Sequence, residues 1–224
     1  MKKRAASGLG RNDRETRDRL LQASAQLFAS RGFRDVTVRD ICRAARANVA
    51  AVNYHFGDKL GLYREVLQVA IDAMRETNEA GQRAAEGQPP TEQLRRYLSV
   101  FLRRVLNPEN ETIHRLIQRE ADHPTSATDT MIEQALRPRV EFFATVVAEL
   151  MGCEPADPRV LRCVGSILAQ TIIYVRKNPM AERLGFVFKP TPENIEAAAR
   201  HIAEFSVAGI RAIAAQKPAA DRLR

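Results

Sequence analysis

The residues best suited to recognition chemistry lie between Thr37 and Phe56, in the stretch TVRDICRAARANVAAVNYHF. A helix over its second half would leave Ala50, Asn53 and Tyr54 on the outward face, with His55 at the flank. Small and polar residues of this kind suit the major groove of DNA, where bulky side chains would clash with base edges. The stretch therefore predicts a DNA-binding helix-turn-helix.

Two short helices would hold these side chains in place. Thr37 followed three residues later by Asp40 is typical of a capped helix start, with an acidic residue in the first turn. Arg46 and Ala47 interrupt the apolar pattern, and Asn48 is a suitable N-cap for the second helix. The expected buried residues are Val38, Ile41, Cys42 and Ala45 in the first helix, and Val49, Val52 and Phe56 in the second.

The composition predicts an all-α protein. The chain has 224 residues, 45% of them hydrophobic, so a sizeable core is available. It has no Trp, only 11 Gly and 11 Pro, and no long alternation of β-branched residues. Ala, Leu, Arg and Glu dominate instead, which favours helices.

The positive charge is concentrated in the N-terminal part. The formal net charge is +8, and residues 1–60 hold 13 Lys and Arg against 6 Asp and Glu. This distribution is typical of proteins that contact phosphate groups. A solvated basic surface with a disordered N-terminus is the alternative, and it explains the charge equally well.

The cysteines and apolar runs favour an intracellular protein. Cys42, Cys153 and Cys163 show no CxxC spacing, and Cys42 is expected to be a small buried apolar residue. The opening MKKRAASGLGRNDRE has no apolar core after its basic residues, and no apolar stretch reaches the roughly 18 residues that span a bilayer. We expect a soluble, cytoplasmic protein with no cofactor and no membrane contact.

The helical pattern divides the chain into three parts. Residues 1–12 are expected to form a flexible basic arm, and residues 13–58 a three-helix, homeodomain-like helix-turn-helix domain. Residues 59–224 would form a larger helical domain. A helix from Lys59 to about Asn78 would join the two with almost no linker, and Pro138 predicts a break or kink further along.

The last two predicted helices, over residues 158–175 and 192–215, carry apolar stripes that suggest a subunit contact. Small residues in the stripes would allow close helix approach, and two helices from each subunit would form a four-helix bundle. Alternatively, both stripes face the core of their own domain. The stripe residues are Leu161, Val164, Leu168, Ile172 and Val175 in the first helix, and Ile195, Ala199, Ile202, Ser206, Gly209 and Ile213 in the second.

Residues 14–67 resemble the N-terminal domain of TetR/AcrR-type transcriptional repressors. The resemblance is carried by the pattern LLQASAQLFASRGF-x-x-VTVRDICRAA-x-x-NVAAVNYHFGDK-x-x-LY. The NYHFGDKLGLY segment and the later chain further resemble the subgroup with a CecR-like C-terminal domain. The resemblance implies an all-α homodimer on a palindromic double-stranded DNA operator. It also implies that residues 59–224 form the ligand-binding and dimerisation domain, where a small-molecule inducer binds. The inducer would release the repressor by altering the spacing of its two DNA-reading heads.

The sequence departs from the family pattern in the turn between the two motif helices. The family usually carries Gly where this chain has Arg46. A non-glycine residue held in the left-handed conformation would cost about 1 kcal/mol. The added charge near the DNA is a possible compensation.

Positions matched to the family motif imply individual DNA contacts. Thr37 would contact a phosphate, and Arg39 a guanine edge or a phosphate. Ala50 and Asn53 would reach base edges, Ala50 against a thymine methyl and Asn53 with two hydrogen bonds to adenine.

Phosphate contacts are implied for Tyr54, His55 and Lys59, although Tyr54 could serve packing alone. A catalytic or metal-binding role for His55 is not expected, because no carboxylate or thiol lies at ligand spacing from it. The full set of DNA-contact candidates is Thr37, Arg39, Asn48, Val49, Ala50, Asn53, Tyr54, His55 and Lys59.

A pocket for a hydrophobic or amphipathic inducer would need apolar walls and a few polar groups. Each candidate could equally be ordinary core or surface. A metal site at His114, Glu120, Asp122 and His123 is not expected, because the spacing matches no helical ligand pair. The ligand-contact candidates are Phe101, Val105, His114, Ile117, Glu120, His123, Phe142, Phe143, Val146 and Tyr174.

Two other function classes compete with a ligand-responsive repressor. An architectural DNA-binding protein without ligand control would show little sequence preference and no cavity in its C-terminal domain. An enzyme with a DNA-binding head is not expected, because the sequence has no GxSxG, P-loop, dinucleotide fingerprint or paired catalytic carboxylates.

Overall fold

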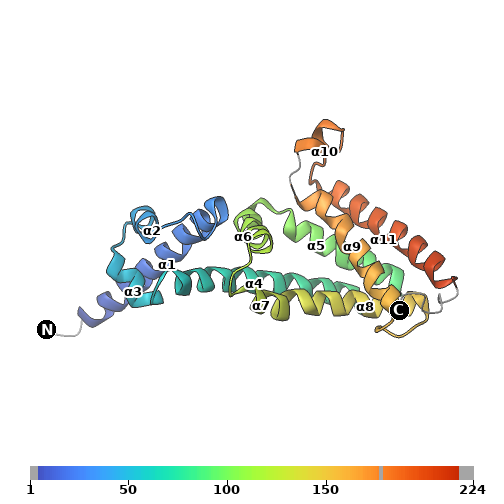
Figure 1. The fold of residues 1–224 in the computed structure, drawn as a ribbon, viewed down its shortest axis with the longest axis horizontal. Coiled ribbons are helices and arrows are strands. Elements are labelled where there is room, and N and C mark those ends of the chain that lie inside the picture. Colours follow the sequence, from blue (N-terminus) through green and yellow to red (C-terminus); the bar gives the residue numbers. More distant parts are fainter. Residues whose placement is uncertain (1–4, 177–178, 217–224) are drawn as a thin grey trace, which may run out of the picture. The chain divides into compact units, whose positions relative to one another are not determined.

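The computed structural model describes residues 5–176 and 179–216, with side chains from residue 12 onward. Every regular element in these ranges is helical, as the composition predicts (Figure 1). The elements are α1 (Ala5–Arg31), α2 (Val38–Ala45), α3 (Val49–Phe56), α4 (Lys59–Ala85), α5 (Pro90–Val105), η1 (Pro108–Asn110), α6 (Glu111–Asp122), α7 (Thr128–Met131), η2 (Ile132–Leu136), α8 (Arg137–Met151), α9 (Pro158–Val175), α10 (Pro179–Arg183) and α11 (Pro192–Ala214).

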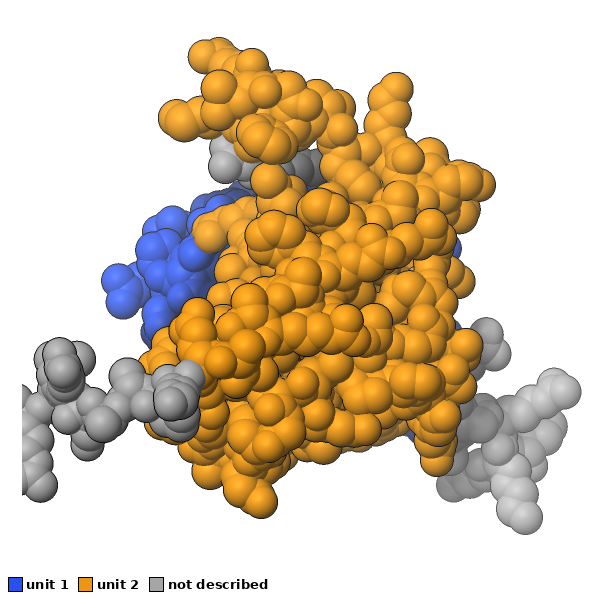
Figure 2. Space-filling model, turned by 90° about the vertical axis from the view of Figure 1, so that its right-hand side faces the viewer, with its two compact units in different colours: residues 1–73, 109–132 blue, residues 74–108, 133–224 orange. Residues whose placement is uncertain are grey.

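The chain forms two compact units, coloured blue and orange in Figure 2. Unit 1 comprises residues 1–73 and 109–132, and unit 2 comprises residues 74–108 and 133–224. The first part of α4 belongs to unit 1 and its second part to unit 2. Unit 1 therefore contains α6 as well as the helix-turn-helix.

Unit 1 is built around fully buried apolar side chains from each of its main helices. Phe28 of α1, Ile41 of α2 and Val52 of α3 are fully buried. Leu116 brings α6 into the same apolar cluster. Burial of side chains of this size contributes roughly 1.5–3 kcal/mol each. The helix-turn-helix thus packs on α1, the start of α4 and α6.

The structure corrects the prediction of a flexible arm over residues 1–12. Residues 5–12 are helical and belong to α1, whereas residues 1–4 lie outside the described range. Gly8 and Gly10 disfavour a helix here, but each residue added to an existing helix gains a hydrogen bond without a new nucleus. The helix therefore begins before Asp13, the start that the sequence predicts.

The core of unit 2 lies between α5, α8, α9 and α11. Tyr97 of α5 stacks on Phe142 of α8, with ring centroids 4.8 Å apart. Gly81 of α4 is required beside this pair, because a Cβ there would lie 2.7 Å from the Tyr97 ring. Glu196 ties α11 to α5 by accepting hydrogen bonds from Ser99 Oγ, at 2.6 Å, and from Arg95.

The expected disruption at Pro138 is a π-helical turn. η2 precedes α8, and the wider π turn makes room for a proline ring that would clash with the carbonyl four residues earlier in a regular helix. Asn78 Nδ2 donates a hydrogen bond of 2.7 Å to the backbone carbonyl of Ala135 in this turn. Tyr97 Oη and Arg139 Nε both donate to Asn78 Oδ1, at 2.8 and 3.0 Å. A buried polar network therefore holds η2 in place.

The short helix α10 was not predicted from the sequence. It projects from unit 2 between α9 and α11 (Figure 1). Met180 and Leu184 of this segment are both 73% exposed. No helix among the described residues is long and apolar enough to cross a bilayer.

Candidate nucleic-acid interface

The start of α2 is fixed by the predicted capping box. Thr37 Oγ1 accepts a hydrogen bond of 3.1 Å from Asp40 N, and Asp40 Oδ2 accepts one of 3.1 Å from Thr37 N. The bonds from the Thr37 side chain and backbone hold the pKa of Asp40 below its usual value. Arg39 is exposed beside this cap. The cap therefore presents Arg39 to the solvent on the first turn of α2.

The turn between α2 and α3 contains a left-handed residue at the position where the family usually carries glycine. Arg46 has φ 50° and ψ 48°, and it is the one non-glycine residue with positive φ among those described. Its backbone N–H donates to the Arg43 carbonyl, and Ala47 N donates to the Cys42 carbonyl at 2.9 Å. The side chain of Arg46 is exposed, which leaves its charge available to a polyanion.

Replacement of Arg46 by glycine should raise the free energy of unfolding by up to about 1 kcal/mol, because glycine adopts this conformation without the Cβ clash. Arg46→Ala is the matched control, since it removes the same charge but keeps the strain. Urea denaturation followed by circular dichroism measures both variants. An R46G protein no more stable than R46A would show that the turn is unstrained.

The outward face of α3 holds three of the predicted DNA-contact residues. Ala50 and Asn53 are exposed, and Tyr54 is 77% exposed. Asn48 Oδ1 accepts a hydrogen bond of 2.8 Å from Ala51 N, which confirms its role as N-cap. Val49 was expected on the buried face, but it is 44% exposed. It is the first residue of α3, and a helical side chain points toward the N-terminal end of its helix, so Val49 points away from the packed part of α3. Val52 and Phe56 provide the buried side of α3.

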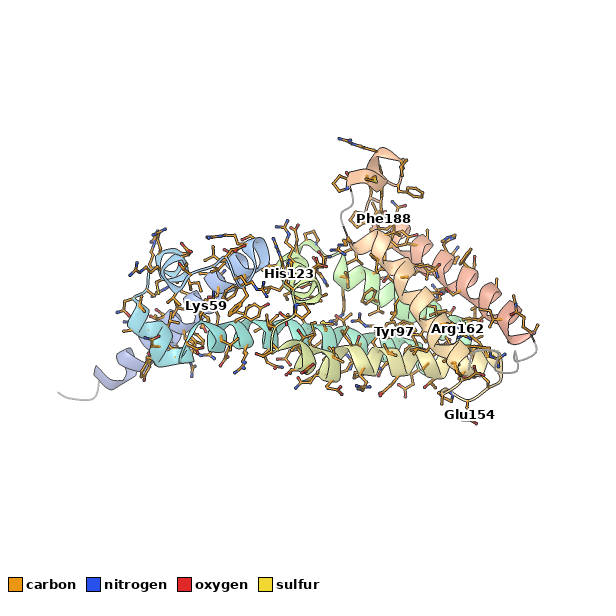
Figure 3. All side chains as sticks on the ribbon, viewed as in Figure 1. Lys59, Tyr97, His123, Glu154, Arg162 and Phe188 are labelled. Atoms are coloured by element: carbon orange, nitrogen blue, oxygen red, sulfur yellow. The ribbon has the colours of Figure 1, made fainter. Side chains whose placement is uncertain are left out.

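The structure directs His55 and Lys59 inward, which corrects their expected exposure to phosphate. The imidazole of His55 is 8% exposed and its Nε2 lies 3.3 Å from Asp13 Oδ1 of α1. Lys59 is labelled in Figure 3. Its Nζ donates a hydrogen bond of 2.8 Å to the Val36 carbonyl and lies 4.3 Å from the centroid of the Phe33 ring. The Asp13 carboxylate and the Val36 carbonyl are therefore within reach of His55 and Lys59, respectively. Lys59 therefore anchors the loop that precedes α2.

Because Lys59 is bonded inside the motif and Arg39 is exposed, substitutions of the two residues should have different effects on stability and on DNA binding. Lys59→Met should lower the free energy of unfolding by roughly 1–2 kcal/mol through the lost hydrogen bond and cation–π contact, but leave the salt dependence of DNA binding unchanged. Arg39→Gln should do the reverse: it should leave stability nearly unchanged and reduce the salt slope by about 1. Fluorescence anisotropy with a duplex across a KCl series measures the slope. A reduced slope for K59M would mean that its ammonium group reaches a phosphate.

The predicted ligand-contact residues do not form a single group. Phe101, Val105, Phe143 and Val146 are buried in the unit 2 core, where they pack against other apolar side chains. Tyr174 packs on Phe188, with ring centroids 4.8 Å apart. Four other candidates are in unit 1, on α6 or directly after it: His114, Ile117, Glu120 and His123.

Glu120 is a structural residue rather than a free ligand contact. It is fully buried and accepts hydrogen bonds from Tyr63 Oη at 2.7 Å, from Thr125 N and Oγ1 at 2.9 and 2.8 Å, and from Thr128 Oγ1. Burial and the bond to Glu120 together raise the pKa of Tyr63 far above its usual value. The carboxylate is occupied by four donors, so the prediction that it faces an inducer is wrong.

The predicted subunit stripe of α11 is also corrected. Ile195, Ala199, Ile202 and Ser206 are buried in the core of their own chain, as is Val164 of α9. Leu168, Val175 and Ile213 are half-buried. Leu161, Ile172 and Gly209 are the exposed members. The exposed positions of α11 include Phe205 and Ala208, which lie off the predicted stripe, together with charged residues such as Glu204.

The described residues include no group of three or more His, Cys, Asp or Glu side chains placed to hold a metal ion. Cys42 is buried, as predicted, and burial raises the pKa of its thiol.

Two families match the chain in order. Residues 20–66 match the family described as "Bacterial regulatory proteins, tetR family". Residues 90–210, more than half of the chain, match "HTH-type transcriptional dual regulator CecR, C-terminal domain". The chain belongs to the TetR family and has a CecR-type C-terminal domain. It is therefore a DNA-binding transcriptional regulator, and its relatives are regulators rather than enzymes.

Two curated TetR-family relatives show how the similarity is distributed. The transcriptional dual regulator CecR of Shigella flexneri is 27% identical over 168 residues, which cover 69% of this chain and 75% of that protein. The transcriptional repressor KstR2 of Mycolicibacterium smegmatis is 41% identical over 56 residues, which cover 25% of this chain and 27% of that protein.

Solved structures of TetR regulators share the fold. The regulator PfmR of Thermus thermophilus is 20% identical, with a TM-score of 0.61 over 84% of this chain and 97% of PfmR. AibR, solved in complex with isovaleryl coenzyme A and operator DNA, is 18% identical, with a TM-score of 0.61 over 87% of this chain and 97% of AibR.

Proposed function

We propose that this TetR-family protein is a cytoplasmic repressor that binds a palindromic operator as a homodimer and is released by a small molecule. The exposed face of α3 carries the proposal, because it combines Ala50, Asn53 and Tyr54 on a helix fixed at both ends. Arg39 of α2 and Arg46 of the turn flank that face with positive charge. A helix of this kind fits the major groove, with the arginines directed at the phosphates or a guanine edge.

The exposed faces of α9 and α11 support a second copy of the chain as the partner. Gln170 Nε2 donates to Ser206 Oγ at 3.0 Å, and Arg159 donates to the Gln216 carbonyl at 3.4 Å, so the two helices run in opposite directions. Gly165 therefore lies level with the turn of α11 that contains Gly209. A Cβ added at either glycine would meet no atom within 4 Å.

The two glycines thus have no packing role inside the chain. Exposed apolar residues lie on the same helices, with Leu161 63%, Ile172 54% and Phe205 65% exposed. Because the two glycines carry no side chain, the backbones of these helices could come close to those of a second copy. An apolar surface of this kind suits a contact around a two-fold axis. The pair of helices from each copy would complete a four-helix bundle.

A groove in unit 2 is our candidate site for the inducer. It has a volume of about 470 Å³, within the range of small-molecule sites, and Phe142 of α8 forms its apolar wall. Glu79, Arg83 and Glu86 line it, and Arg83 lies 3.6 Å from Glu79. Arg83 and Glu79 balance each other, and Glu86 adds one negative charge to the lining. An amphipathic ligand with an apolar body and a cationic group therefore fits the groove. The structure of AibR with isovaleryl coenzyme A and operator DNA shows that a protein of this fold accommodates both partners.

Asn53→Ala should reduce discrimination between the operator and its single-base variants by about 1–3 kcal/mol, because the amide makes the base-specific contact. Anisotropy titrations of the operator and its variants at constant salt measure this difference. Gln118→Ala, on α6 and away from the motif, is the control and should leave discrimination unchanged. Retained selectivity in N53A would remove Asn53 from the base-reading residues.

Selection from random duplexes tests the proposed function. Sequencing of the DNA retained by the full-length protein should yield an inverted repeat. Enrichment of no sequence would favour an architectural DNA-binding protein instead. A compound that fills the unit 2 groove should then release the selected duplex, and release should fail in Phe142→Ala.

A further inference from the structure

A second cavity lies in unit 1, beside the helix-turn-helix. Its volume is about 210 Å³, and its walls are the loop from Arg31 to Asp35, Tyr63 of α4, Arg119 of α6 and residues 123–125 after that helix. His123, labelled in Figure 3, stands at the α6 side. The volume is several times the roughly 30 Å³ of a water molecule but smaller than most drug-sized sites. It suits a ligand with a single ring.

The charged groups around this cavity are mainly cationic. Arg31, Arg34 and Arg119 line it, against one carboxylate, Asp35. Arg31 donates to the Asp35 backbone carbonyl at 2.7 Å and also lies 3.6 Å from the Asp40 carboxylate, which partly balances its charge. Arg119 donates to the Ser30 carbonyl at 2.8 Å, and this bond leaves its guanidinium charge unbalanced.

Two of the lining side chains have no partner among the described residues. Arg34 is exposed, and its guanidinium has no hydrogen bond or ion pair with another described residue. The His123 imidazole is likewise without a partner among the described side chains. The cavity therefore presents an excess of positive charge that its own carboxylate does not balance.

The inner wall of the cavity is aromatic. The rings of Phe33 and Tyr63 are 4.7 Å apart, and Lys59 lies over the Phe33 ring. The Tyr63 hydroxyl donates to Glu120 and the residue is only 2% exposed, so the half-buried Phe33 provides most of the aromatic surface that a ligand can reach. An apolar wall with arginines at its edge suits a planar molecule that carries an anionic group.

We infer that this cavity binds a small organic anion, specifically an aromatic carboxylate. Its carboxylate would lie between Arg34 of the loop and Arg119 of α6, with the ring against Phe33 and Tyr63. The same loop leads directly to Thr37, the N-cap of α2, and Lys59 holds its Val36 carbonyl. A ligand that joins the loop to α6 would therefore bias the position of α2, and its binding would be linked to DNA affinity. This site is distinct from the unit 2 groove proposed for the inducer.

Fluorine NMR on the full-length protein tests the inference directly, without DNA. 4-Fluorobenzoate is the probe, and neutral 4-fluorobenzamide has almost the same shape. Benzoate should bind and benzamide should not. Arg34→Gln and Arg119→Gln should each weaken benzoate binding about tenfold, as expected for a lost charge-assisted hydrogen bond. Arg115→Gln is the matched control, because Arg115 is an exposed α6 residue paired with Glu111 outside the cavity.

The outcomes separate the possibilities. If R119Q lowers the melting temperature through its lost bond to Ser30, R34Q decides, because Arg34 supports no described contact. Equal binding of benzoate and benzamide, or unchanged binding in R34Q, would overturn the inference. Displacement of benzoate by equimolar inorganic phosphate would overturn the aromatic part, since the site would then recognise the charge alone. Failure of operator binding would leave this result unaffected.

Discussion

Replacement of Glu120 by alanine should lower the free energy of unfolding by about 3 kcal/mol, one of the two largest effects expected for a single site in this protein. Four donors from Tyr63, Thr125 and Thr128 converge on its fully buried carboxylate. Removal leaves the buried Tyr63 hydroxyl without an acceptor, and an unsatisfied buried group costs about 1–3 kcal/mol. Urea denaturation of the full-length protein at pH 7 measures the loss.

The same carboxylate should make stability depend on acid. Burial by itself would raise the pKa of Glu120, but the hydrogen bonds from Thr128, Tyr63 and Thr125 outweigh it and hold the pKa below the ordinary value of 4.5. Its stabilising contribution is therefore present above pH 4.5 and is lost as the pH falls through the lower folded-state pKa. Glu120→Gln should flatten this acid limb, because the amide does not titrate.

Glu111→Ala provides the control on the same helix. Glu111 is exposed and pairs with Arg115 at 2.7 Å, so its loss should change stability by less than about 1 kcal/mol. Equal, small losses in E111A and E120A would mean that Glu120 is replaceable and that α6 is held to unit 1 by apolar packing alone.

The double substitution Gly165→Leu with Gly209→Leu should abolish dimerisation while the chain stays folded. Each dimer would carry four new leucines where helices approach closely, and each overpacked side chain costs about 1–3 kcal/mol. At the lower limit, the dimer dissociation constant should rise about a thousandfold. Within one chain the change is harmless, because both positions are open and leucine is the better helix former.

Sedimentation velocity of the double variant and of the wild type measures this effect. Glu141→Leu, an exposed substitution on α8, is the control for added surface hydrophobicity and should remain dimeric. A dimeric G165L/G209L protein would place the subunit contact elsewhere, for instance on the exposed apolar residues of α10.

Local signals in the sequence were enough to predict the helix-turn-helix and the ends of α9 and α11, but not the start of α1 or the end of α4, which continues to Ala85 rather than stopping near Asn78. The Thr37 and Asn48 caps and the initial prolines of α9 and α11 act within one turn, so they are legible without the fold. Glu120 shows the limit of such local signals. Its partner Tyr63 is 57 residues away, and neither periodicity nor spacing indicates that the two meet.

The stripes of α9 and α11 show a second limit. Both faces of α11 contain small and apolar residues, so the periodicity alone did not decide which face the chain buries. Phe205 and Ala208, which lie off the predicted stripe, are exposed, and so is Gly209 of the stripe itself. Lys59 was similarly ambiguous, because only the folded loop brings the Val36 carbonyl within reach of its ammonium.

Sedimentation of the protein with its selected duplex tests the proposed two-headed repressor most directly. The stoichiometry at saturation should be two chains per palindromic duplex, and a duplex with one half-site scrambled should bind far more weakly. A single chain bound to each duplex, with full affinity for the isolated half-site, would contradict it.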